Sequence, residues 1–129
     1  MEEKYGTKQI RESKLEAFPH AKEDLITVKF IIPEFTCLCP RSGFPDFAAI
    51  RITYIPNELC VELKSLKLWI NSFRDKAIYH EDVASAIGNA LQVLLKPQSI
   101  SVEADFNVRG NIHTVVTWTR GGDFLHEKI

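Results

Sequence analysis

Four segments of the chain alternate apolar and polar residues with the period of two that is typical of β-strands. They cover residues 25–32, 47–55, 100–107 and 112–119. We expect Pro33 to end the first strand, because proline cannot donate a main-chain hydrogen bond, and residues 34–46 to form a loop. Pro56 marks a turn after the second strand, followed by a short extended piece at 59–63. A further turn at 109–111 precedes the last strand.

Between the second and third strands the apolar spacing changes to three and four residues, which is the period of an amphipathic helix. The apolar face of the first helix consists of Leu63, Leu66, Ile70 and Phe73. A second helix is expected over residues 81–95, with a buried side that consists of Val83, Ile87, Leu91 and Leu94. Glu81 and Asp82 lie in its first turn, where the helix dipole favours negative charge, and Pro97 follows its end.

The resulting order is strand, strand, helix, helix, strand, strand, which favours an α+β fold with an antiparallel four-stranded sheet. The two helices fall between strands 2 and 3 and can cover one face of that sheet. Its open edges would be paired if copies of the chain associated and closed their sheets into a barrel. We expect an irregular N-terminal arm at 1–24, where Pro19 prevents a long helix, one domain at 25–120 and a polar tail at 121–129.

The amino-acid composition limits the kinds of molecule that this protein is expected to bind. The chain has 129 residues, enough for one domain, with 16 basic and 17 acidic residues. This balance argues against direct nucleic-acid binding, which usually requires a basic surface. No apolar run reaches the length of about 20 residues that a membrane span needs, and the first residues do not resemble a signal peptide. We therefore expect a cytoplasmic protein in which the three cysteines form no disulfide framework.

Cys39 is the candidate nucleophile. It lies in a segment bracketed by proline and glycine, and a nearby cation such as Arg41 would lower the pKa of its thiol. The alternative interpretation is a half-buried loop thiol without chemistry. A metal site formed by Cys37 and Cys39 is a third possibility, but a Cys-x-Cys spacing is not the usual spacing of zinc ligands.

Asp46 follows Cys39 by seven residues, across a turn that could bring its carboxyl back towards the thiol. A carboxyl beside an attacked carbon could donate a proton if burial favoured its protonated form. The alternative is a simple turn residue, since aspartate is frequent in turns.

Two lysines, Lys64 and Lys67, share a face at the start of the first helix, where they could bind a phosphate or form a solvated basic surface. Glu81 could accept two N–H bonds from a guanine-like ring, or it could stabilise only the start of its helix. His80 is open to either interpretation.

These residues also carry a family resemblance. The octapeptide Glu-Leu-Lys-Ser-Leu-Lys-Leu-Trp at residues 62–69 resembles the signature of the short, single-module nitrile reductases of queuosine biosynthesis, the 7-cyano-7-deazaguanine reductases. The similarity extends to residues 35–48, 73–74, 80–82 and 106–111, and it covers most of the chain from about 25 to 118.

The resemblance implies the tunnelling fold, in a barrel-forming homo-oligomer of two stacked pentamers with active sites at subunit interfaces. It implies reduction of the nitrile of 7-cyano-7-deazaguanine to the primary amine, with two NADPH per turnover and no metal. The product, 7-aminomethyl-7-deazaguanine, is used in tRNA modification. The chain lacks the G-x-G-x-x-G dinucleotide fingerprint, so side chains and interfaces would have to hold the cofactor.

The resemblance also assigns roles by position. Cys39 corresponds to the nucleophile that forms a thioimide with the nitrile carbon, and Asp46 corresponds to the general acid. The substrate-holding positions are Val61, Glu62, Leu63, His80 and Glu81. The positions that meet the cofactor phosphates are Lys64, Lys67 and Arg109.

Three other functions are considered. A related tunnelling-fold amidinotransferase would use the same thioimide without hydride, and a purine- or pterin-binding module would do no chemistry. A zinc-dependent ring-opening enzyme of the same superfold is the third. Part of the resembling family has a protective disulfide, but no cysteine near the second helix could partner Cys39, which leaves Cys37 or Cys60 as possible partners.

Overall fold

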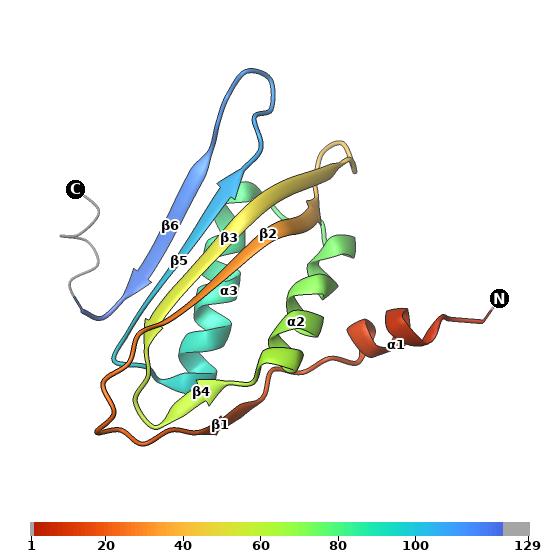
Figure 1. Ribbon diagram of the computed structural model, residues 1–129. Helices are drawn as coiled ribbons and strands as arrows, with labels where there is room; N and C mark the ends of the chain where they lie inside the picture. The colour runs from red at the N-terminus through yellow and green to blue at the C-terminus, as the bar shows by residue number, and fades with distance from the viewer. Residues whose placement is uncertain (1, 123–129) are drawn as a thin grey trace.

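The computed structural model describes residues 2–122 (Figure 1). Its strands are β1 (Ala17–Pro19), β2 (Val28–Leu38), β3 (Pro45–Ile55), β4 (Leu59–Val61), β5 (Ser99–Phe106) and β6 (Val115–Arg120). Its helices are α1 (Tyr5–Arg11), α2 (Leu63–Asn71), the 3₁₀ turn η1 (Ser72–Asp75) and α3 (His80–Leu95).

The main sheet is antiparallel, with the strand order β2-β3-β5-β6, and β1 pairs with β4 in a separate two-stranded ribbon. Both α2 and α3 lie on the same side of the main sheet, and they connect its second strand to its third (Figure 1). The predicted α+β fold, antiparallel sheet and one-sided helices are therefore confirmed. Within residues 2–122, no helix is both long enough and apolar enough to cross a membrane.

The prediction that Pro33 ends the first strand is wrong. β2 continues to Leu38, with an irregularity in its register between Ile32 and Phe35. Proline is tolerated here because β2 is an edge strand of the main sheet. On the outer side of an edge strand no neighbouring strand needs a main-chain N–H as a hydrogen-bond donor. The predicted loop at 34–46 therefore shrinks to the six residues 39–44.

The prediction of an irregular N-terminal arm is wrong. It contains α1 and β1, and β1 pairs with β4 in the register Ala17–Val61. The Glu62 N–H donates to the Glu16 carbonyl over 2.8 Å, and the Glu16 N–H donates to the Ser65 hydroxyl over 3.0 Å. The arm is thus fastened to the start of α2. The division into arm, domain and tail stays a prediction, and the tail from residue 123 lies outside the described residues.

The core lies between the helices and the sheet, and it follows the predicted helix faces except at Leu63 and at Leu94, which is only partly buried. Leu66, Ile70 and Phe73 are buried, but Leu63 is 64% exposed. Leu63 is the first residue of α2, and it borders an open cavity between β2 and α2 that leaves its side chain exposed. The last strand starts at Val115, three residues later than predicted, because Ile112 closes a turn with Arg109.

Gly88 allows α3 to pack closely on β6. A Cβ atom added at this position would overlap the ring of Trp118. We expect Gly88→Ala to lower the free energy of unfolding, because overpacking costs about 1–3 kcal/mol and the higher helix propensity of alanine offsets at most roughly 1 kcal/mol of it. Denaturant unfolding at fixed protein concentration measures this, with Gly6→Ala in α1 as the control, because no atom lies within 4 Å of a Cβ there. Equal stability of Gly88→Ala and wild type would contradict the packing argument.

Candidate active site

The loop between β2 and β3 presents Cys39. The Cys39 N–H donates to the Phe44 carbonyl and the Gly43 N–H donates to the Cys39 carbonyl, each over 2.8 Å. Gly43 has a φ of +76°, a left-handed conformation that glycine adopts without steric cost. These features close a short turn that holds the half-buried Cys39 in a fixed position.

Hydrogen bonds lower the pKa of the Cys39 thiol. The largest cause is the Ser42 side chain, followed by the main-chain N–H groups of Ser42 and Arg41. Burial and the charge of Asp46 act in the opposite direction and are smaller. The pKa therefore moves in the direction predicted, but Arg41 acts through its main chain and not through its guanidinium. A lowered pKa increases the fraction of nucleophilic thiolate.

Cys37 differs sharply from Cys39. It is fully buried, and burial, with smaller effects from Asp46 and Cys39, raises its pKa to about 11. Cys37, Cys39 and Cys60 are all free thiols. Of the two neighbouring cysteines, Cys39 alone has the exposure and the pKa direction of a nucleophile.

Asp46 is directly opposite Cys37 in the β2–β3 ladder and is 5% exposed. Its Oδ1 accepts a hydrogen bond of 2.6 Å from Arg109 Nη1, which also donates to the Pro45 carbonyl over 3.0 Å. Its Oδ2 lies 3.2 Å from His80 Nε2. The buried carboxyl is therefore held on both oxygens by residues distant in sequence.

His80 is the first residue of α3, and its ring stacks on Phe106 with 3.8 Å between centroids and 6° between planes. Phe106, buried on β5, thereby orients the imidazole towards Asp46. The sequence placed Phe106 in a strand and in a segment of family resemblance but gave it no role of its own, because stacking between residues 26 positions apart leaves no local signal. Glu81 follows His80 in the first turn of α3 and is exposed.

A second group of predicted residues surrounds the start of α2. Glu62 is the N-cap, and its carboxylate accepts hydrogen bonds from the N–H groups of Lys64 (2.9 Å) and Ser65 (2.8 Å). These bonds lower the pKa of Glu62. Val61 is 3% exposed, and its N–H donates to the Tyr54 hydroxyl over 3.1 Å. The carboxylate of Glu62 thus occupies the helix N-terminus that was expected to help bind a phosphate.

The two lysines line neighbouring cavities. Lys64 borders a cavity of about 550 Å³ between the N-terminal arm and α2. Lys67 borders one of about 310 Å³ between β2 and α2, with a largely apolar lining. Within residues 2–122, neither ammonium group has a carboxylate within 4.0 Å. Both charges are therefore available to an anion.

The two groups lie at opposite ends of the sheet (Figure 1). Cys39, Asp46 and His80 are at the end where β3 begins, and Val61 contacts Tyr54 near the end of β3. Eight residues of strand at 3.3 Å each separate Asp46 from Tyr54 by roughly 26 Å. One chain therefore does not bring all the predicted site residues around one small molecule.

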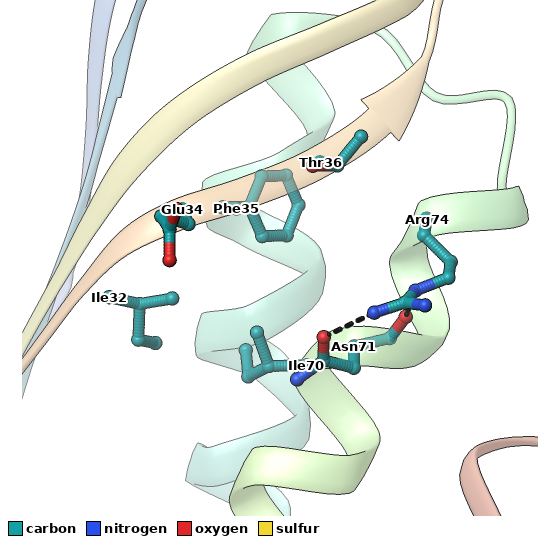
Figure 2. A pocket seen from close by; sticks show the side chains of 7 residues that line it. All are labelled: Ile32, Glu34, Phe35, Thr36, Ile70, Asn71 and Arg74. Atoms are coloured by element: carbon teal, nitrogen blue, oxygen red, sulfur yellow. Dashed lines mark hydrogen bonds between the residues drawn. The ribbon is translucent and has the colours of Figure 1, made fainter. Parts of the chain in front are cut away.

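A further cavity of about 290 Å³ lies between β2 and the α2–η1 segment (Figure 2). Arg74 crosses its edge, where it donates to the Asn71 side chain over 2.7 Å. The lining consists of Ile32, Glu34, Phe35, Thr36, Ile70, Asn71 and Arg74. None of the predicted catalytic, substrate or cofactor residues borders this cavity. The His80 imidazole contacts the buried carboxyl of Asp46, and the charge of that carboxyl acts on the Cys39 thiol.

Within residues 2–122, no group of three histidine, cysteine or acidic side chains is arranged to hold a metal ion. The described part of the chain therefore offers no ligand set for the zinc ion that the ring-opening alternative would need.

The fold has a counterpart among solved structures. The solved structure of the archaeosine synthase QueF-Like in its apo form shares the fold, with a TM-score of 0.68 over 80% of this chain and 99% of that one. Sequence identity to it is 20%, so this likeness concerns the fold alone and is consistent with the tunnelling fold. The family model described as QueF-like protein matches residues 45–123.

Curated relatives make the assignment more specific. The chain is 53% identical over 116 residues to a protein of Aquifex aeolicus, covering 89% of this chain and 90% of the relative. It is 49% identical to a protein of Sulfurimonas denitrificans and 44% identical to one of Wolinella succinogenes, each covering 88% of this chain and 94% of the relative. All three are named NADPH-dependent 7-cyano-7-deazaguanine reductase. The chain belongs to the QueF-like protein family.

Proposed function

We propose that this protein reduces the nitrile of 7-cyano-7-deazaguanine to the primary amine of 7-aminomethyl-7-deazaguanine, using two NADPH per turnover. The observation that carries the proposal is the half-buried Cys39 thiol, with a lowered pKa, near the buried carboxyl of Asp46. The names of the curated relatives supply the substrate and the cofactor. This function places the protein in queuosine biosynthesis in the cytoplasm, without direct nucleic-acid contact.

Cys39 and Asp46 carry the first step of the proposed reaction. The Cys39 thiolate adds to the nitrile carbon, one π-bond electron pair moves to the nitrogen, and Asp46 transfers a proton to that nitrogen. The product is a covalent thioimide whose C=N bond accepts hydride more readily than a free nitrile. His80, fixed by its stack on Phe106, orients the Asp46 carboxyl during the transfer.

NADPH supplies a hydride to the carbon in each of the two reductions. After the first, the C–S bond breaks and Cys39 leaves as the thiolate, which regenerates the nucleophile and leaves an imine for the second reduction. Two protons from the medium complete the balance, so that one nitrile, two NADPH and two protons give one amine and two NADP⁺. No step requires a metal.

We propose that a second copy of the chain completes the site. Val61, Glu62 and Leu63 would hold the substrate from one subunit, and His80 and Glu81 from another, because a single chain separates these groups. Within residues 2–122 no further strand pairs with the outer edges of β2 and β6, which could pair between copies to close a barrel. A decamer of two stacked pentamers is the assembly that we propose.

The lysines are the proposed phosphate contacts of NADPH, because their ammonium groups have no carboxylate partner in the described chain. We expect Lys64→Ala or Lys67→Ala to raise the KM for NADPH more than that for NADH, while the Cys39 adduct still forms. Added salt should weaken NADPH binding to the wild type more than to either variant, because salt screens charge pairs. Initial-rate kinetics measure these effects. If both variants bind NADPH as the wild type does, the lysines form only a solvated surface.

A direct assay separates the reductase from the alternatives. NADPH absorbance should fall only when 7-cyano-7-deazaguanine is present. An amidinotransferase would form the Cys39 adduct without consuming NADPH, and a binding module would form no adduct. Substrate protection of Cys39 from iodoacetamide, followed by mass spectrometry, distinguishes these two.

A further inference from the structure

We propose that Arg109 is a positioning residue that aims the Asp46 carboxyl at the reacting nitrogen. This role differs from the cofactor-phosphate contact that the family resemblance implies for the same residue. It rests on the proposed function, because it concerns the residue that would donate the proton.

The first support is the geometry around Asp46. Arg109 binds Oδ1 at 2.6 Å while His80 approaches Oδ2 at 3.2 Å, so that two different elements fix the carboxyl plane. Arg109 also donates to the Pro45 carbonyl at 3.0 Å, which fastens the guanidinium to the residue before Asp46. Its side chain is 43% exposed, whereas that of Asp46 is 7% exposed. Arg109 therefore covers the carboxyl from the solvent side.

The second support is the turn that presents Arg109. The two residues after it, Gly110 and Asn111, have φ angles of +57° and +70°, as in the type I′ turn of tight hairpins. Arg109 and Ile112 exchange both main-chain hydrogen bonds across this turn, over 2.9 and 3.0 Å. Glycine and asparagine favour this backbone geometry, so the turn that carries Arg109 does not depend on the contact of its side chain with Asp46.

The base of the same hairpin is fastened beside Asp46. The Asn107 N–H donates to the Phe47 carbonyl over 2.9 Å, which ties the segment after β5 to the residue that follows Asp46 in β3. The hairpin, its turn and the Arg109 side chain are therefore joined by hydrogen bonds to the segment that carries the Asp46 carboxyl. Without Arg109, Oδ1 would lose its bond and the carboxyl could turn away from the reacting nitrogen.

A double-mutant cycle tests this role. We expect Arg109→Ala to lower kcat by about 10- to 100-fold, which is the scale on which small misplacements of a catalytic group act. The KM for NADPH should change less than kcat, and Arg109→Lys should recover part of the rate. In an Asp46→Asn background, adding Arg109→Ala should change kcat by less than about 2-fold, because Arg109 would act only through Asp46.

A second pair of variants tests the turn. Asn111→Gly keeps the left-handed conformation and should retain the wild-type kcat, whereas Asn111→Val should lower it, because a β-branched residue disfavours positive φ. The positioning role would be overturned if Arg109→Ala and Asp46→Asn lowered kcat by independent factors that multiply in the double variant. It would also be overturned if Arg109→Ala changed only the KM for NADPH. Either result would leave the proposed function intact. A normal rate for Asp46→Asn itself would remove the proton donor from both proposals.

Discussion

Replacing Cys39 with alanine is expected to abolish the covalent adduct and to lower turnover by roughly 10³-fold or more, the scale on which deletion of a covalent nucleophile acts in other enzymes. The thiol is the atom that bonds to the nitrile carbon, and no other described thiol can replace it. Cys37 is fully buried, and Cys60 lies at the other end of the sheet beside the start of α2. Intact-protein mass spectrometry after incubation with the nitrile alone measures the adduct.

Cys60→Ala is the matched control, and it should keep both the adduct and substantial activity. Labelling of the wild type adds a pH test. Hydrogen bonds lower the pKa of Cys39, so iodoacetamide should modify it at a lower pH than an ordinary thiol. Cys37, with a pKa of about 11 and no exposure, should stay unmodified. An adduct formed in equal yield by Cys39→Ala would remove the thiol from the mechanism.

Replacing Asp46 with asparagine should lower kcat by roughly 10²–10⁴-fold, which is the usual contribution of general acid catalysis. Asparagine preserves the size of the side chain and can still accept the bond from Arg109, but it cannot transfer the carboxyl proton. The KM for NADPH should change little, because the proposed contacts to the NADPH phosphates are Lys64 and Lys67 and not Asp46. Steady-state kinetics at several pH values measure the loss.

The chain offers a close control for Asp46. Asp105 on β5 is also bound by an arginine and a histidine, Arg51 at 3.3 Å and His113 at 2.6 Å. It is more exposed than Asp46, and its position in β5 alternates with the buried residues Ala104 and Phe106. Asp105→Asn should therefore leave kcat within a few fold of the wild type. Equal losses in the two variants would indicate a general structural effect of removing an ion-paired carboxylate.

Local patterns were sufficient to predict most of the fold. The apolar residues that alternate along β3 and β5 and recur along α2 and α3 are the residues that these elements bury in a common core. The errors came from effects that one segment does not reveal. Pro33 looked like the end of a strand, but its cost depends on whether β2 is an edge strand, and strand order is a property of the whole sheet. The arm looked irregular because β1 is a strand only through its pairing with β4.

The candidate site was predictable to a similar extent. Cys39 and Asp46 are close in sequence, so the turn between them could be inferred. The bond between Arg109 and Asp46 spans 63 positions, and the stack of Phe106 on His80 is also nonlocal. Contacts of this kind depend on how strands and helices are placed, so the sequence suggested roles for Arg109 and His80 but not their common partner.

The most direct test of the central claim is the stoichiometry of the complete reaction. Purified protein, 7-cyano-7-deazaguanine and excess NADPH should yield 7-aminomethyl-7-deazaguanine, identified by mass spectrometry, with two NADPH oxidised for each amine formed. The Cys39→Ala variant should yield neither product nor NADP⁺. Formation of an adduct without NADPH oxidation, or an amine formed without loss of NADPH, would contradict the account.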